Sequence, residues 1–250
     1  MHHPNQYHPS QFVAHRGYAA RYPENTLEAI EAAIAAGALF VEMDIQFSKD
    51  GIPVVYHDDT LSRTSGIPGS LFDHTASELL LLPAHEPKRF GLQFDGVKIP
   101  SGEALVALIA RHPAVHFYVE LKEESIHRFT ADFCLRTLAN LLAPVRQQCT
   151  LISFDTEAMG RAKREFGFPT IGIVFRNWAK RNELIEATAA DIAYSNVERI
   201  PADAAITANC PVATYEIADP ALAAATLERG AAKVETFAIG ELIEALCRKA

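Results

Sequence analysis

The chain has 250 residues, of which 49% are hydrophobic and 22% are charged, and its formal net charge at pH 7 is −8. This composition supports a sizeable core and excludes a globally disordered chain. The acidic balance argues against a nucleic-acid partner, because nucleic-acid-binding domains are usually basic. It leaves room for an anionic small-molecule substrate, because the local charge of a site can oppose the global charge.

The cysteines and the start of the chain bear on its compartment. The four cysteines are scattered, without a CxxC pair. This spacing matches neither the common zinc sites nor a disulfide framework, and it favours a reducing compartment such as the cytoplasm. The start, Met1 to Ser10, is polar and lacks the apolar segment of a signal peptide. No apolar run approaches the ~20 residues that cross a bilayer, so we expect no membrane insertion.

The first elements predict a strand followed by a helix. Phe12 to His15 has the pattern of a strand. Asn25 and Glu28 have the spacing of a capping box, which predicts that Asn25 is the N-cap of the following helix and has no catalytic role. Apolar residues then recur at helical spacing until Gly37, where we expect the helix to end.

The next segments predict a second strand and an irregular region. Phe40 to Phe47 reads as a strand, Lys49-Asp50-Gly51 as a turn, and Pro53 to His57 as another extended run. The segment from about Thr60 to Ile99 is rich in proline and glycine, and we interpret it as an insertion. A helix at Ser101 to Arg111 restarts the regular pattern.

Strands and helices alternate through the rest of the chain. Strands are predicted at His116–Leu121, Thr150–Phe154, Thr170–Phe175, Ile192–Ser195, Val212–Tyr215 and Ala232–Thr236. Helices are predicted at Ala131–Leu142, Thr156–Phe166, Glu183–Ala190, Pro220–Glu228 and Glu241–Cys247. Eight strands, each followed by a helix, match a (β/α)8 TIM barrel of about 250 residues.

We therefore predict a single α/β domain over residues 10–250, with a small inserted subdomain at about 60–99, after the second strand. The alternative is a doubly wound open sheet. That fold typically has a glycine-rich phosphate-binding loop after its first strand, and this chain has none. A barrel places catalytic residues at the C-terminal ends of its strands. The candidates in such positions are His15, Glu42, Asp44, His57, Glu120 and Lys122.

Glu42 and Asp44 are the first candidate metal ligands. They alternate with Val41, Met43 and Ile45 along a predicted strand, so both carboxylates lie on one face. Two buried acids repel each other and lose solvation, and a divalent cation is the simplest compensation. The alternative is an exposed edge strand with a solvated acidic face.

Glu120 and Lys122 also share a strand face. In a barrel, Glu120 would join Glu42 and Asp44, giving three carboxylates around one divalent ion. Lys122 and Arg16 would then attract a phosphate oxygen. The alternatives are a surface ion pair between Glu120 and Lys122 and a structural ion pair for Arg16.

Two histidines, His15 and His57, flank the acidic strand in the sequence. Imidazole titrates near neutral pH and can accept or donate a proton. One histidine that takes a proton while the other gives one is suited to displacement at phosphorus. Either histidine, taken alone, could instead be a hydrogen-bonded structural residue.

These motifs together resemble the glycerophosphodiester phosphodiesterase family. The resemblance is strong over Val13 to Thr64, returns at Glu120 to Lys122, and continues more loosely at Ser153-Phe154-Asp155. The motifs that carry it are His15-Arg16-Gly17, Pro23-Glu24-Asn25-Thr26, Glu42-Met43-Asp44, Lys49-Asp50-Gly51, His57-Asp58 and Glu120-Leu121-Lys122.

The resemblance implies a fold, a site and a reaction. The fold is a TIM barrel with a small insertion after the second strand. The site is a Ca²⁺ or Mg²⁺ ion held by Glu42, Asp44 and Glu120, with His15 and His57 as acid/base pair and with Arg16 and Lys122 near the phosphate. The reaction is hydrolysis of a glycerophosphodiester to an alcohol and glycerol 3-phosphate, in which the glycerol 2-hydroxyl attacks phosphorus and water opens the cyclic intermediate.

The C-terminal third departs from the family pattern. Tyr215-Glu216 stands where Trp-Thr is frequent, Thr236-Phe237 where Thr-Asp is common, and Pro100-Ser101-Gly102-Glu103 where Pro-Thr-Leu-Glu is usual. Tyr215 keeps an aromatic surface for the glycerol, whereas Phe237 removes a carboxylate from the mouth. These changes bear on substrate preference and leave the expected metal ligands intact.

Two other functions stay open at this point. One is a related phospholipase or sphingomyelinase type of barrel enzyme that acts on intact lipid, for which Ser70-Leu71-Phe72 and Leu79 to Leu82 would supply apolar loops. The other is a catalytically silent binding protein on the same scaffold, although both histidines and all three acids are present.

Overall fold

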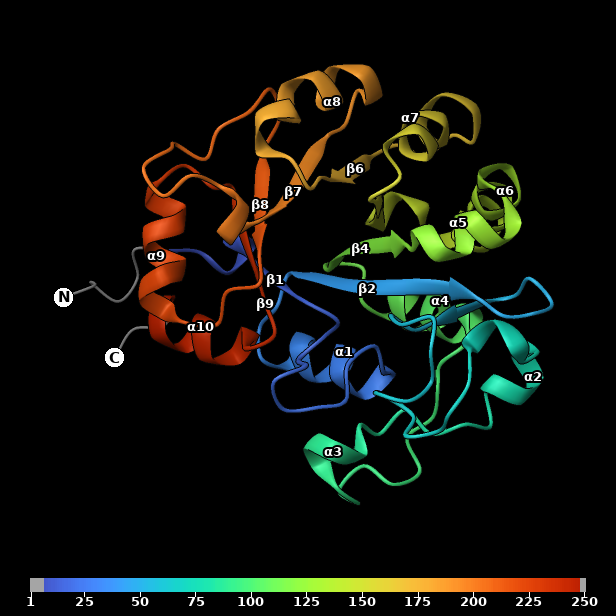
Figure 1. Ribbon diagram of the computed structural model, residues 1–250. Helices are drawn as coiled ribbons and strands as arrows, with labels where there is room; N and C mark the ends of the chain where they lie inside the picture. The colour runs from blue at the N-terminus through green and yellow to red at the C-terminus, as the bar shows by residue number, and fades with distance from the viewer. Residues whose placement is uncertain (1–6, 248–250) are drawn as a thin grey trace.

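A closed barrel of parallel strands forms the centre of the computed structural model, which describes residues 7–247 (Figure 1). Closure depends on β1 (Phe12–Ala14), which pairs in parallel with both β2 (Phe40–Phe47) and β9 (Lys233–Thr236). The other barrel strands are β4 (His116–Leu121), β5 (Cys149–Ser153), β6 (Ile171–Val174), β7 (Ile192–Asn196) and β8 (Val212–Tyr215). These eight strands confirm the predicted TIM barrel, since an open doubly wound sheet would leave its first strand paired differently.

The longer helices lie outside the ring of strands (Figure 1). They are α1 (Leu27–Ala35), α4 (Gly102–Arg111), α5 (Glu123–Phe129), α6 (Ala131–Leu141), α7 (Thr156–Glu165), α8 (Arg181–Thr188), α9 (Pro220–Glu228) and α10 (Ile239–Leu246). Helix α5 was not expected from the sequence. It starts directly after β4 without a side-chain cap, and Thr130, at φ 86°, separates it from α6. Within residues 7–247, none of the helices has the length and apolar character that a bilayer crossing requires.

The expected cap of α1 is wrong by one residue. Thr26 is the N-cap, and its hydroxyl accepts a hydrogen bond from the backbone N–H of Ala29. Asn25 precedes it in a left-handed conformation, at φ 57°. The turn therefore directs the Asn25 side chain away from the helix and toward β2, where it has a different role.

The core has two layers, which follow from the alternation of side chains along the strands. Val41, Met43 and Ile45 of β2 face outward and pack in the main hydrophobic cluster, against the helices. Inside the barrel, a smaller cluster includes Tyr118, Tyr194 and Ile152. The inward face of β2 is thereby left for its polar residues.

Strand β3 (Pro53–Val55) is not part of the barrel. It turns back antiparallel to β2, with Val55 opposite Ile45, so the chain returns toward the level of Asp44. Gly51 lies in the connecting turn at φ +75°, and a Cβ there would come within 2.7 Å of the Phe133 ring. The hairpin is therefore packed closely against α6.

The segment between β3 and α4 contains two short helices, α2 (Ala76–Leu79) and α3 (Pro87–Phe90), which lie to one side of the barrel (Figure 1). Leu71 and Leu79 are buried in a small hydrophobic cluster of this segment. The segment rejoins the hairpin at Pro100, whose carbonyl accepts a hydrogen bond of 2.9 Å from the backbone N–H of Val55. The C-terminal end of the segment is thus fixed to β3.

Candidate active site

A pocket of about 270 Å³ opens among the C-terminal ends of the barrel strands. Its polar lining comes from both ends of the chain and includes His15, Arg16, His57, Glu120, Lys122, Glu216 and Glu235. Apolar and aromatic side chains line the rest, namely Ile152, Phe154, Val174, Tyr194 and Tyr215. This is the end of a barrel at which the loops build active sites.

Glu42 and Asp44 project from the inner face of β2 and are each only 1% exposed. The alternative of a solvated acidic edge strand is therefore wrong. Both residues lie in the middle of β2 rather than at its end, because β2 continues past the pocket into the β2–β3 hairpin. The strand that carries the acids is thus paired on both sides where they project.

Asn25 holds Asp44 from two directions. Its amide group donates to Asp44 Oδ2 at 2.8 Å, and its carbonyl oxygen accepts from the Asp44 backbone N–H at 2.9 Å. Asn25 is therefore a positioning residue of the site and not the helix cap that the sequence pattern predicted. A bidentate contact of this kind fixes the rotamer of Asp44.

Glu120 and Lys122 form a buried ion pair, with 2.7 Å between Lys122 Nζ and Glu120 Oε1. Both are less than a tenth exposed, so the alternative of a surface ion pair is wrong. Lys122 Nζ also lies 3.4 Å from Asp44 Oδ1. The lysine therefore links the acid on β4 with the acid on β2.

The three carboxylates converge. Glu42, Asp44 and Glu120 each offer an oxygen within 4.8 Å of the oxygens that the other two offer. Burial and the neighbouring acids, Asp44 first, raise the pKa of Glu42 well above its ordinary value. Burial also tends to raise the pKa of Asp44, but Lys122, His57 and Arg16 together hold it well below its ordinary value.

Glu42 Oε1 is buried and has no hydrogen-bond partner. Such an atom is costly unless a proton or a cation lies against it. Three convergent oxygens with one unpartnered atom fit a hard divalent cation, which prefers carboxylate ligands. The residues present are therefore compatible with a metal of this kind.

His15 follows β1 and is packed against the end of β9. Its ring is stacked on Phe237, with centroids 4.5 Å apart and planes 8° apart. Its Nε2 lies 3.7 Å from Glu42 Oε2. Burial and the positive charge of Arg16 lower the pKa of His15 well below its ordinary value.

His57 reaches the pocket from the β2–β3 hairpin rather than from a barrel strand. Its Nδ1 lies 2.6 Å from Asp58 Oδ1, and its backbone oxygen accepts from Gln46 of β2 at 3.1 Å. Burial tends to raise the pKa of Asp58, but contacts with His57 and Arg63 hold it well below its ordinary value. An ionised Asp58 at Nδ1 leaves Nε2 as the free nitrogen of the ring.

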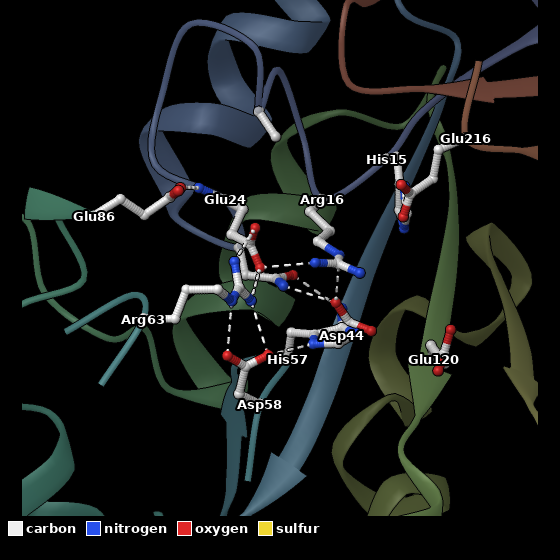
Figure 2. A network of polar contacts seen from close by, with 12 residues as sticks. His15, Arg16, Glu24, Asp44, His57, Asp58, Arg63, Glu86, Glu120 and Glu216 are labelled. Carbon is white, nitrogen blue, oxygen red and sulfur yellow. Dashed lines mark hydrogen bonds and ion pairs between the residues drawn. The ribbon is translucent and has the colours of Figure 1, made fainter. Parts of the chain in front are cut away.

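Arg16 and Arg63 belong to one ion-pair network (Figure 2). Arg16 pairs with Glu24 at 2.9 Å and with Asp44 at 3.2 Å. Arg63 contacts both Glu24 oxygens at 2.7 Å and Asp58 at 2.8 Å. The network therefore connects Arg16, which contacts Asp44, with Asp58, which contacts His57.

The sequence interpretation missed four members of the site: Glu24, Asn25, Arg63 and Glu235. Glu24 and Asn25 belong to a quoted motif, but their partners are distant in the chain. Arg63 lies in the irregular segment and carries no local signal. Glu235 had a usable signal, because it alternates with Val234 and Thr236 on the last strand and so faces inward.

Fold and site together define a (β/α)8 barrel protein with an acidic centre and two histidines at the C-terminal mouth. A family model described as "Glycerophosphoryl diester phosphodiesterase family" matches residues 15–231. The chain belongs to this family.

Curated relatives match over part of their length. A glycerophosphodiester phosphodiesterase from Bacillus altitudinis is 37% identical over 120 residues, which are 48% of this chain and 48% of the relative. Glycerophosphodiester phosphodiesterase 1 from Mus musculus is 39% identical over 167 residues, 67% of this chain and 49% of the relative. The matched region thus spans about half the length of these relatives.

Solved structures share the fold. A phosphodiesterase from Oleispira antarctica, described as a complex with the product sn-glycerol-3-phosphate, has a TM-score of 0.80 at 24% identity, covering 94% of this chain and 96% of that one. A structure from Silicibacter pomeroyi has a TM-score of 0.82 at 19% identity, covering 95% and 93%. At these identities the likeness establishes the barrel.

Proposed function

We propose that the protein hydrolyses glycerophosphodiesters to an alcohol and glycerol 3-phosphate. The observation that carries this proposal is the convergence of three buried carboxylates, one of which, Glu120, lines the same pocket as His15 and His57. Family membership and the activities named for the curated relatives support the same reaction. The product named for the Oleispira structure agrees with it.

Glu42, Asp44 and Glu120 would hold the metal, which we propose to be Ca²⁺ or Mg²⁺. When bound, a divalent ion would offset negative charge on the phosphate oxygens. Water would complete its coordination, since either ion takes more oxygen ligands than three carboxylates supply. Asn25 would keep Asp44 oriented as a ligand, because it engages both the side chain and the backbone of that residue.

His15 and His57 are proposed as the acid/base pair. The stacking of His15 on Phe237 restricts its ring to one plane. Asp58 orients the ring of His57 and leaves Nε2 for the substrate. One histidine would take the proton of the attacking glycerol 2-hydroxyl while the other would protonate the departing alcohol, and the roles would reverse when water opens the cyclic phosphate.

Arg16 and Lys122 are proposed to position the phosphate. Both line the pocket while remaining paired with acids. An arginine or lysine that is already oriented by a carboxylate loses little conformational freedom when it also donates to a phosphate oxygen. Their contribution would therefore be mainly to binding and to alignment for attack.

We further propose that residues 10–250 act as one catalytic domain in the cytoplasm, with the 60–99 segment as a small subdomain on it. The substrate would be a small soluble phosphodiester, and no nucleic acid or stable membrane insertion would be involved. Action on intact lipid is less well supported. Leu71 and Leu79 are buried in the segment rather than placed around the pocket, although Leu81 is exposed.

The test is hydrolysis of glycerophosphocholine, measured as release of glycerol 3-phosphate with and without a chelator. Chelator-sensitive release that returns with Ca²⁺ or Mg²⁺ supports the proposal. Activity confined to lipid vesicles would favour the phospholipase type of enzyme. Tight binding without turnover at any metal concentration would favour a silent binding protein.

A further inference from the structure

Glu235 is the least satisfied charged group of the pocket. It projects inward from β9, is 3% exposed, and its Oε1 has no hydrogen-bond partner. The family match ends at residue 231, so this glutamate lies outside the matched region. Phe237, directly after β9, was expected to remove a carboxylate from the mouth of the barrel. Glu235, two residues earlier on β9, supplies a carboxylate there.

The charges at the mouth are unevenly distributed. Arg16 and Lys122 both contact Asp44, and Lys122 also contacts Glu120. Among residues 7–247, Glu235 forms no ion pair with a lysine or arginine side chain, and Oε1 of Glu42 has no hydrogen-bond partner. Direct contacts with lysine or arginine side chains are therefore made by Asp44 and Glu120 and, among the described residues, not by Glu42 and Glu235.

A second set of ligands converges at this place. His15, Glu42 and Glu235 each offer a ligand atom within 4.8 Å of the atoms that the other two offer. Nε2 of His15 lies 3.7 Å from Glu42 Oε2, and Oε1 of Glu42 and Oε1 of Glu235 are buried without a hydrogen-bond partner. Buried ligand atoms from three different strands or strand ends therefore converge on one small volume, and two of the three side chains carry an unpartnered oxygen.

We propose that His15, Glu42 and Glu235 form a second divalent-cation position beside the Glu42–Asp44–Glu120 position, with Glu42 shared between them. The donor set differs from that of the first position, because it contains a ring nitrogen. Such a set selects ions that accept imidazole, such as Mn²⁺, Co²⁺ and Zn²⁺, over Ca²⁺ and Mg²⁺. The inference rests on the same acidic mouth as the proposed function.

Occupancy of this position has a functional consequence. An ion bound to a ring nitrogen of His15 prevents that nitrogen from accepting or donating a proton. The second position is therefore inhibitory, and a transition metal in excess suppresses turnover that Ca²⁺ or Mg²⁺ supports. Inhibition by such ions should then depend on Glu235, which is not a ligand of the Glu42–Asp44–Glu120 position.

Calorimetric titration with Co²⁺ and with Ca²⁺ tests the proposal on the full chain. Wild-type protein is expected to bind two Co²⁺ but one Ca²⁺. Glu235→Gln, which keeps the shape of the side chain, is expected to weaken the second Co²⁺ by at least about tenfold, since loss of a direct ligand costs no less than loss of an outer-shell partner. Glu157→Gln, at an exposed glutamate on α7, is the matched control and should still bind two.

Crystals soaked in Co²⁺ place the ions by anomalous scattering. The proposal expects one peak among His15, Glu42 and Glu235 in wild-type protein and its loss in Glu235→Gln. One Co²⁺ in wild-type protein at every concentration, or two in Glu235→Gln with the affinities of wild-type protein, would overturn the proposal. If Glu235→Gln does not fold, His15→Asn removes the nitrogen ligand and must abolish the same peak.

Turnover separates this proposal from the proposed function. With Ca²⁺ present, half-inhibition by Co²⁺ should need at least about tenfold more metal in Glu235→Gln than in wild-type protein, following its weaker binding. A wild-type protein that binds two Co²⁺ but never hydrolyses a glycerophosphodiester would refute the proposed function and leave the second position standing. Hydrolysis that is indifferent to Co²⁺ would refute its inhibitory role.

Discussion

The two halves of the barrel mouth are built differently. In the N-terminal half, Asp44 and Glu120 are buried but paired, and each is held by a neighbouring cation or amide. In the C-terminal half, Glu235 is equally buried but unpaired, and its neighbours Tyr194 and Thr214 also have unpartnered hydroxyls. A network whose members satisfy one another fixes geometry, whereas unsatisfied groups are available to a ligand.

This difference matches the distribution of sequence motifs. The motifs that resemble the family lie between β1 and α1, on β2, in and directly after the β2–β3 hairpin, and at the end of β4. The departures at Tyr215-Glu216 and Thr236-Phe237 lie on β8 and directly after β9. We therefore expect changes in the N-terminal half to remove activity and changes in the C-terminal half to alter what the pocket accepts.

Loss of either histidine should have the largest effect. His15→Ala and His57→Ala are each expected to lower kcat by about 10²–10⁴-fold, the usual contribution of a positioned acid or base. Binding of Ca²⁺ should remain nearly intact, because neither ring is a ligand of the three-carboxylate position. Steady-state kinetics and calorimetry check both parts, and substantial residual activity in both variants would refute the acid/base assignment.

Loss of a shared carboxylate comes next. Glu42→Ala is expected to weaken binding of Ca²⁺ by at least about tenfold, because a direct ligand is removed. Turnover should fall in parallel when the metal is limiting. A metal titration indistinguishable from that of the Glu157→Gln control would contradict the proposed ligand set.

The supporting network predicts a smaller effect on stability. Arg63→Gln removes the hydrogen bonds to Glu24 and Asp58 and is expected to lower the free energy of unfolding at pH 7 by about 1–3 kcal/mol. The exposed pair of Arg111 with Glu31 is the matched control, and Arg111→Gln should cost less than about 1 kcal/mol. Urea unfolding measures both, and equal losses would mean that the network adds nothing.

The same network predicts the direction of a pH effect. The pKa values of Glu24 and Asp58 are lowered in the fold, so the unfolded chain binds protons at a higher pH than the native protein does. Their contribution to stability is therefore present above about pH 5 and declines as the pH falls through the ordinary carboxyl range. The decline should be shallower in Arg63→Gln, and a steeper one would contradict the assignment.

The smallest effect is expected in the C-terminal half. Glu216 lies at the mouth, 3.8 Å from Nδ1 of His15, and its side chain is 45% exposed. Glu216→Gln is expected to change the ratio of kcat/KM for glycerophosphocholine to that for a neutral glycerophosphodiester by up to about fivefold, as suits a rim charge. A loss of kcat comparable to that of His57→Ala would mean that this half takes part in the chemistry.

Local alternation was enough to predict part of the site. Glu42 and Asp44 could be placed inside a barrel because their neighbours on β2 are apolar at every second position. Glu235 shows the same alternation on β9, but a single acid on a short strand is easily taken for a surface residue. The barrel itself followed from the order of strands and helices.

Other parts of the site depend on long-range contacts that no local pattern encodes. The spacing of Asn25 and Glu28 also fits a capping box. Only the contact of Asn25 with Asp44 in the fold shows that Asn25 orients this acid. Arg63 reaches Glu24 from an irregular segment 39 residues further along the chain. Helix α5 has no side-chain N-cap, so its start could not be predicted from a capping pattern in the sequence.

The pinned ends of the 60–99 segment have a consequence for how this protein can diverge. His57 is bound to β2 before the segment begins, and Pro100 is bound to Val55 where it ends. The intervening loops can therefore change in length without re-aligning His57, provided that Arg63 stays in contact with Asp58.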